Sequence, residues 1–214
     1  SYTGEMQFIR VAAAVAAVCS IGAVARAQAP AKSSSRQAAE GYKLRGDKLA
    51  RAGQLDSAVR EYRTALSIDS TYADAHNQLG SVFFAQRKVS QAITEYRLAL
   101  SQAADFPSAR YNLAYTLRRA SRFAESVVEY RRFLQSSPRD PDGHYGIGEA
   151  LKATGDKGGA RAAFERYAEL EKRPQEAIWV KRAKDLAAEI AAAGIAANPQ
   201  SLMVQSTVDA PPAM

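Results

Sequence analysis

Residues 73–106 read ADAHNQLGSVFFAQRKVSQAITEYRLALSQAADF, and this stretch decides the fold. Its small and apolar residues recur at helical intervals on either side of a break between Phe84 and Ser90. These residues are Leu79, Gly80, Phe83, Ala92, Tyr96 and Ala99. The spacing predicts a helix, a short turn and a second helix, each apolar on one side.

The same pattern recurs every 34 residues along the chain. We expect small residues in both helices of a unit to let them approach closely, and aromatic residues to fill the space between units. Gly53 and Gly155 suit the turns between helices. Four positions keep the 34-residue step over four units: Gly46, Gly80, Ala114 and Gly148; Leu49, Phe83, Leu117 and Leu151; Ala58, Ala92, Ser126 and Ala160; Tyr62, Tyr96, Tyr130 and Phe164.

This pattern resembles the tetratricopeptide repeat family over Ala39 to Pro174. The resemblance implies an all-α fold, a right-handed α-solenoid of four helix-turn-helix repeats at 39–72, 73–106, 107–140 and 141–174. It also implies that the first helix of each repeat lines a concave groove that binds proteins. The sequence departs from the family pattern at the aromatic position early in each first helix, which holds Tyr42, His76, Arg110 and His144.

One subtype of this family grips the terminal carboxylate of chaperone tails with five Lys, Asn and Arg residues. Lys43 matches the first of these positions, whereas Asp47, Gln78, Ser108 and Asn112 do not match the others. We therefore expect no chaperone-tail binding of this kind.

The segments on either side of the repeats have different compositions. Residues 175–194 are predicted to form an amphipathic capping helix, which would cover the apolar face that a terminal repeat exposes. Its apolar stripe comprises Trp179, Ala183, Leu186 and Ile190. Residues 195–214 are predicted to be a flexible tail, and residues 28–38 a flexible linker.

The first 27 residues have the layout of a secretory signal peptide. Arg10 supplies the positive charge, Val11 to Ala25 carry no charge, and Ala25-Arg26-Ala27 matches the small-x-small cleavage pattern. We expect cleavage before Gln28 and a periplasmic protein. One alternative is an uncleaved anchor in the cytoplasmic membrane, with membrane contact through residues 7–27. Another is a lipoprotein, for which the residues before Cys19 are a poor match.

The residues that could carry chemistry do not form a catalytic pattern. Cys19 is the single cysteine, which excludes an intramolecular disulfide and a cysteine-based metal site. His76 and His144 occupy equivalent packing positions two repeats apart, too far to share a metal ion. Asp140 and Asp142 suit a helix N-terminus better than an acid–base pair. We predict no catalysis, cofactor, metal or small-molecule substrate.

The outward positions of the first helices are the candidate binding residues, because aromatic residues beside arginines are typical of interface hot spots. The alternative is that some of these tyrosines pack between adjacent first helices. The candidates are Lys43, Arg51, Asn77, Phe84, Tyr111, Tyr115, Arg118, Arg119, Tyr145 and Lys152.

Charge is unevenly spread along a chain whose formal net charge is +7. The third repeat, 107–140, carries seven arginines against Glu125, Glu129 and Asp140. We therefore predict that the ligand is an acidic or aromatic-acidic segment of a protein. The alternative is that the arginines form a solvated helix surface without a partner.

These features predict a non-catalytic protein-interaction scaffold or adaptor in the bacterial periplasm, an accessory or assembly subunit of a membrane or envelope complex. The alternative function is binding of anionic surfaces or nucleic acid through the basic third repeat. Export and the acidic residues within the patch make nucleic acid the weaker alternative.

Overall fold

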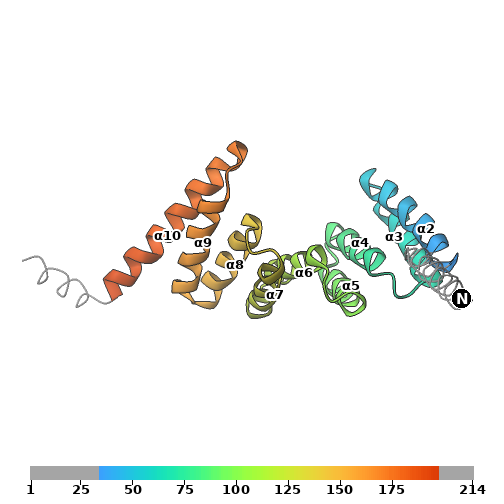
Figure 1. Cartoon of the computed structure of the whole chain (residues 1–214), viewed down its shortest axis with the longest axis horizontal. Coiled ribbons are helices and arrows are strands. Elements are labelled where there is room, and N and C mark those ends of the chain that lie inside the picture. The colour runs from blue at the N-terminus through green and yellow to red at the C-terminus, as the bar shows by residue number, and fades with distance from the viewer. Residues whose placement is uncertain (1–33, 198–214) are drawn as a thin grey trace, which may run out of the picture.

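The computed structural model of the chain describes residues 34–197, which form a row of antiparallel helix pairs (Figure 1). The described residues contain helices and no strands, so the prediction of an all-α repeat solenoid is confirmed. The helices are α2 (Ser34–Arg51), α3 (Leu55–Ile68), α4 (Ala73–Ala85), α5 (Val89–Gln102), α6 (Pro107–Arg119), α7 (Phe123–Ser136), α8 (Pro141–Thr154), α9 (Lys157–Leu170), the short 3-10 helix η1 (Pro174–Glu176) and α10 (Ala177–Ala197).

Two predicted boundaries differ from the structure. Helix α2 begins at Ser34, so residues 34–38 belong to the first helix and not to a flexible linker. Helix α10 continues to Ala197, three residues beyond the predicted end of the cap, so 195–197 are helical and not part of a tail. The predicted signal segment 1–27 and the rest of the predicted tail, 198–214, lie outside the described residues.

Local sequence explains where the helices start and stop. Pro107 and Pro141 open α6 and α8, a position where the missing N–H of proline costs no helical hydrogen bond. The Asp140 carboxylate accepts a 2.8 Å hydrogen bond from the Gly143 N–H, which confirms its predicted N-cap role. Gly155 ends α8 in the left-handed conformation with φ of 86°.

The glycines of the first helices are the places where the two helices of a repeat come closest. A Cβ added to Gly46, Gly80 or Gly148 would lie 2.7–2.8 Å from the aromatic ring of the second helix in the same repeat. The rings of Tyr62, Tyr96 and Phe164 therefore fill the space between the two helices of their own repeat. Tyr62 and Tyr96 also belong to a core cluster that includes residues of the following repeats. Tyr130 does reach the next repeat, where its hydroxyl would lie 2.5 Å from a Cβ on Gly146.

The core runs along the row, because each helix packs on the helices before and after it. First helices of neighbouring repeats also contact one another, so they share one surface, called the groove below. Helix α10 buries Ala183, Leu186 and Ala187 in the core of the fourth repeat, as expected for a cap. Among the described helices, none is both long and apolar enough to span a membrane.

Candidate protein-binding groove

Four of the predicted binding residues gather around one pocket in the groove. Tyr111, Tyr115 and Arg118 come from α6 and Tyr145 from α8, and the pocket of about 210 Å³ lies between these helices and the start of α10. The Phe84 ring meets Tyr115 edge-on at a centroid distance of 5.6 Å and extends the aromatic surface toward α4. The aromatic candidates from repeats two to four thus lie on one surface around the pocket.

The first wall of the pocket consists of tyrosines from the third repeat. Tyr111 and Tyr115 are stacked, with ring centroids 6.4 Å apart and an interplanar angle of 15°. Tyr111 also meets the edges of Tyr130 and Phe133 at 5.9 and 5.3 Å. Both Tyr111 and Tyr115 are half-buried, so they partly pack between helices and are not the fully exposed cluster that the sequence predicts.

The second wall comes from the fourth repeat and the cap. Tyr145 makes edge contacts with Tyr167, Phe164 and Trp179 at centroid distances of 5.1, 5.7 and 5.9 Å. Trp179 belongs to the predicted apolar stripe of the capping helix, yet it is only partly buried, with an exposed fraction of 46%. Tyr145 therefore packs against three rings and also lines the pocket.

Charged side chains line the pocket together with these rings. Arg118 lies 5.3 Å from the centre of the Tyr115 ring, and its Nη1 is 4.0 Å from a Glu149 carboxylate oxygen. Asp142 and Glu176 supply two carboxylates. Burial raises the pKa of Asp142, as do the nearby carboxylates Asp140, Glu171 and Glu176, while Arg173 opposes this shift.

Two polar atoms of the pocket residues are buried without a partner within the described part of the chain. These atoms are the Tyr130 hydroxyl and the Arg118 Nε. Burial raises the pKa of Tyr130 to about 12 and that of Tyr167 to about 12, so both phenols stay neutral hydrogen-bonding groups near pH 7. A buried polar group without a partner costs free energy that a ligand or a small rearrangement can recover.

The remaining predicted binding residues are not brought to this pocket. Lys43 makes ion pairs of 2.6 Å with Asp74 and 3.0 Å with Asp47 at the N-terminal end of the solenoid. Asn77 is buried and accepts a 3.1 Å hydrogen bond from Asn112, which joins α4 to α6, so its prediction as an exposed groove residue is wrong. The other three are exposed: Arg51, Arg119 and Lys152.

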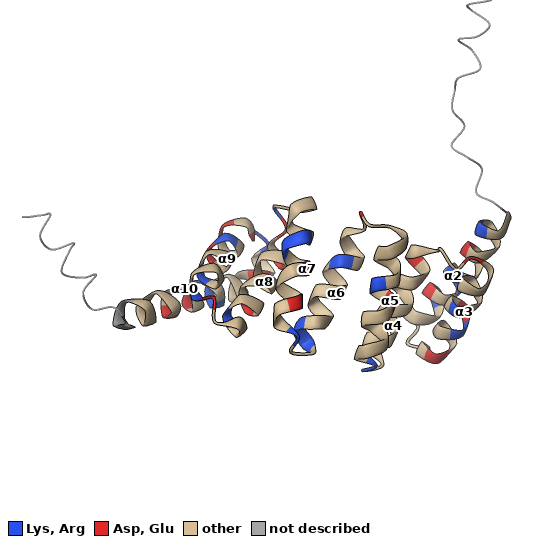
Figure 2. Ribbon diagram, turned by 90° about the horizontal axis from the view of Figure 1, so that it is seen from below, with Lys and Arg blue, Asp and Glu red and all other residues tan. Residues whose placement is uncertain are grey.

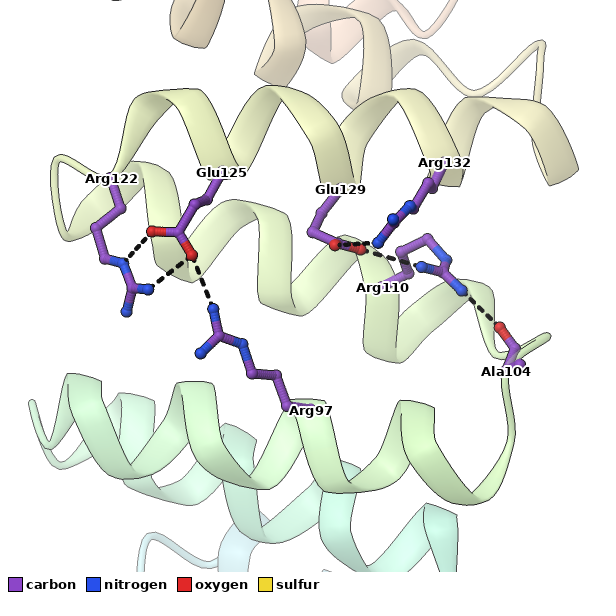
Figure 3. A network of polar contacts seen from close by, with 7 residues as sticks. All are labelled: Arg97, Ala104, Arg110, Arg122, Glu125, Glu129 and Arg132. Atoms are coloured by element: carbon purple, nitrogen blue, oxygen red, sulfur yellow. Dashed lines mark hydrogen bonds and ion pairs between the residues drawn. The ribbon is translucent and has the colours of Figure 1, made fainter.

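Four arginines in and next to the third repeat form ion pairs with Glu125 and Glu129 (Figure 3). Glu125 binds Arg122 and Arg97 at 2.6 and 2.8 Å, and Glu129 binds Arg110 and Arg132 at 3.0 and 2.8 Å. Basic and acidic residues are accordingly interspersed along the solenoid (Figure 2). This pairing weakens the sequence argument for a large basic patch. Arg119, Arg131 and Arg139 form no salt bridge within residues 34–197.

The two histidines hold backbone in place, in agreement with a structural role. His76 Nδ1 lies 2.7 Å from a Glu95 carboxylate oxygen and its Nε2 lies 3.2 Å from the Ser70 carbonyl oxygen. His144 Nε2 lies 3.0 Å from the Pro138 carbonyl oxygen. Among residues 34–197, no group of three or more His, Cys, Asp or Glu side chains could hold a metal ion.

Sequence reasoning missed more than half of the residues that line the pocket. Tyr130 and Tyr167 had been assigned to no binding role, Asp142 to a helix N-terminus and Trp179 to the cap. The only sequence signal was a tryptophan that occurs once in the chain, close to the end of the repeats. The pocket depends on the angle at which α10 crosses the fourth repeat, and a periodic sequence pattern does not specify this crossing angle.

Comparison with known proteins identifies the repeat. A profile described as TPR repeat matches residues 46–87, and one described as tetratricopeptide repeat matches residues 111–177, together about half of the chain. None of the curated proteins compared with the chain matches it.

Solved structures share the fold at low sequence identity. MamA residues 41-end from Desulfovibrio magneticus RS-1 is 15% identical with a TM-score of 0.62, covering 80% of this chain and 97% of that one. YrrB, "a TPR protein with an unusual peptide-binding site", is 18% identical with a TM-score of 0.61, covering 84% of this chain and all of that one. The first TPR of Spaghetti (RPAP3), bound to the HSP90 peptide SRMEEVD, is 19% identical with a TM-score of 0.55, covering 56% and 94%.

The two profile matches, the 34-residue register and the helix pairs agree with one another. The chain belongs to the tetratricopeptide repeat family.

Proposed function

We propose that this protein is a non-catalytic interaction scaffold that binds a segment of a partner protein in the groove. The observation that carries the proposal is the pocket between α6, α8 and α10, which is lined by tyrosines and a half-exposed tryptophan. Aromatic side chains supply large contact areas at a small cost in side-chain entropy, and they dominate the energetics of protein interfaces. Two structural neighbours are described as peptide-binding or peptide-bound proteins, which supports the same reading.

The basic residues that remain unpaired limit where an acidic part of the segment would lie. Arg119 and Lys152 are exposed near the C-terminal ends of α6 and α8, and Arg118 holds its partner Glu149 only at 4.0 Å. An acidic or aromatic-acidic segment would therefore place its carboxylates along this edge of the groove. The alternative of a nucleic-acid or anionic-surface binder has less support, because Arg110, Arg122 and Arg132 of the third repeat are paired with glutamates.

We further propose that the protein is exported and serves a membrane or envelope complex as an accessory or assembly subunit. This proposal rests on the signal-like sequence of residues 6–27. Affinity purification from the native membrane in mild detergent, with mass spectrometry of the partners and of the N-terminus of the bait, tests it. A bait that begins before Gln28 in a stoichiometric membrane complex would indicate an anchored subunit. A bait that begins at Gln28 would indicate a soluble periplasmic protein.

The role of the groove is tested by two matched variants in the same purification. Tyr115→Ala removes a half-buried ring from the pocket wall, whereas Val128→Ala removes an exposed apolar side chain from the second helix α7. We expect the groove variant to lose a partner that the outer-face variant retains. Retention of every partner by Tyr115→Ala, with its fold intact by circular dichroism, would refute binding at the groove.

A further inference from the structure

The pocket has the dimensions of a site for one side chain. Its volume of about 210 Å³ is smaller than the roughly 300–1,000 Å³ of pockets that hold drug-sized ligands. Its walls are two groups of rings, one from the third repeat with Tyr111 and Tyr115, and one from Tyr145, Tyr167 and Trp179. A flat or narrow group that enters between these walls would meet ring faces and edges from both.

Carboxylates outnumber basic groups in the lining. Asp142 and Glu176 share the lining with one basic residue, Arg118, which already lies over the Tyr115 ring and near Glu149. Arg182 is a second basic residue close to the pocket rings, because it lies over Trp179 at 6.0 Å and opposes the rise in the pKa of Tyr145. Arg173 does not balance this excess, because it is committed to Glu171 by hydrogen bonds from its backbone N–H, Nε and Nη2. Its contact with Asp142 is loose at 3.5 Å, and the Asp142 side chain remains 56% exposed.

A second feature is a buried hydroxyl at the pocket that has no well-formed hydrogen bond, although the Arg118 side chain lies close enough to oppose the rise in the Tyr130 pKa. Tyr130 is fully buried at the pocket, and its hydroxyl has no partner within the described residues. A phenol oxygen accepts hydrogen bonds as well as donating one, so a ligand N–H is a suitable partner after a small movement of the covering side chains.

We propose that this pocket binds a cationic side chain of the partner segment, an arginine guanidinium in particular. A guanidinium is planar, stacks on aromatic faces and donates hydrogen bonds to carboxylates, so it matches the two ring walls and the carboxylates of Asp142 and Glu176. Arg118 shows that a guanidinium fits over a ring of this lining. The inference rests on the proposed function, since it names the residue of the partner that the groove recognises.

The geometry favours a cation over an anion at this place. A carboxylate between the walls would be repelled by two acidic residues and would have to compete with Glu149 for Arg118. An acidic neighbour in the same segment would instead lie toward Arg119 and Lys152, at the C-terminal ends of the two first helices. The partner segment would then carry an arginine and an acidic residue a short distance apart.

Trp179 provides a direct readout because it is the single tryptophan of the chain and lines the pocket. The full-length protein is titrated with N-acetyl-argininamide, with the neutral isostere N-acetyl-citrullinamide and with N-acetyl-glutamamide carrying a free side-chain carboxylate. We expect a saturable change of Trp179 fluorescence with the arginine probe. The citrulline probe should bind about tenfold more weakly, which corresponds to about 1.4 kcal/mol.

Two double variants distinguish an effect of the pocket carboxylates on probe binding from an effect of the net charge of the protein. Asp142→Asn with Glu176→Gln should weaken the arginine probe about tenfold, whereas Glu165→Gln with Glu169→Gln on the outer face of α9 should leave it unchanged. Equal binding of the arginine and citrulline probes, stronger binding of the acidic probe or no saturable change would each overturn the proposal. If the pocket double variant still retained the partner that Tyr115→Ala loses, the cation site would be refuted while the scaffold function stood.

Discussion

Four residues at the turns within the repeats share a backbone conformation but not a side-chain type. Gly53, Arg87, Ser121 and Gly155 follow one another at 34-residue steps and have φ of 74°, 62°, 58° and 86°. Glycine adopts this left-handed conformation freely, whereas other residues pay roughly 1–2 kcal/mol for it. The middle two repeats therefore hold strained turns that the outer two avoid.

We predict that Arg87→Gly combined with Ser121→Gly stabilises the protein by about 1 kcal/mol, after allowing for the greater flexibility of glycine in the unfolded chain. Both side chains are exposed, so little packing is lost. The free energy of unfolding in urea measures the effect. Gly53→Ala is the reciprocal control and should lower the same quantity. A double variant less stable than the natural sequence would show that these turns are not strained.

His76 gives the protein a pH-dependent contact. Burial acts to lower the pKa of His76, but the Glu95 carboxylate and the Ser70 carbonyl outweigh it, so the pKa is raised. A raised pKa in the folded state stabilises the protein below the unfolded value of about 6.5, and this contribution disappears as pH rises through the folded pKa. We therefore expect stability to decline above about pH 6.5.

The third repeat suggests the variant that removes this dependence. Arg110 occupies the place equivalent to His76, pairs with Glu129 at 3.0 Å and donates to the Ala104 carbonyl at 2.6 Å. His76→Arg should reproduce that arrangement without a titration near neutral pH. Urea unfolding between pH 6 and 8.5 should show a smaller decline in the variant, and an unchanged slope would assign the decline to another group.

At the level of the helices, α10 packs on the fourth repeat with one side and exposes apolar residues on another. Leu186 is buried against the fourth repeat, whereas Ile178, two turns earlier, is 73% exposed. We expect Leu186→Ala to lower the free energy of unfolding by about 2–4 kcal/mol. The matched variant Ile178→Ala in the same helix should change it by less than about 0.5 kcal/mol. Equal effects of the two variants in urea unfolding would contradict the assignment of α10 as a cap.

The same helix shows how far sequence periodicity reaches. The 34-residue step located both helices of every repeat, since a core position such as Gly80 opposite Tyr96 tolerates only small residues. The step also brought Tyr111, Tyr115, Arg118 and Tyr145 to one surface. It contained neither the crossing of α10, which places Trp179 in the pocket, nor the ion pairs between second helices, such as that of Arg97 with Glu125. These features depend on the crossing angles of helices and on which side chains meet between them, and the repeating pattern specifies neither.

The whole molecule is a row of local contacts, and its core is divided along that row. One cluster of buried residues joins the first two repeats to α6, through Leu79 and Leu113 among others. A second cluster joins the third and fourth repeats to α10, through Tyr130 and Leu151 among others. Stability in such a stack is a sum of repeat and neighbour terms, so the two ends are expected to open separately.

Two matched core substitutions test whether the two clusters open separately. Leu79→Ala and Leu151→Ala remove the same buried side chain from equivalent helices of different clusters, at a cost of about 2–5 kcal/mol each. Native-state hydrogen exchange should then accelerate mainly in α2 to α5 for Leu79→Ala and mainly in α8 to α10 for Leu151→Ala. Uniform acceleration of all helices by either lesion would mean that the solenoid opens as a single cooperative unit. If the two ends open separately, the pocket between α6, α8 and α10 stays intact when the N-terminal repeats loosen. Leu79→Ala should then retain the Trp179 fluorescence response to the arginine probe, whereas Leu151→Ala should lose it.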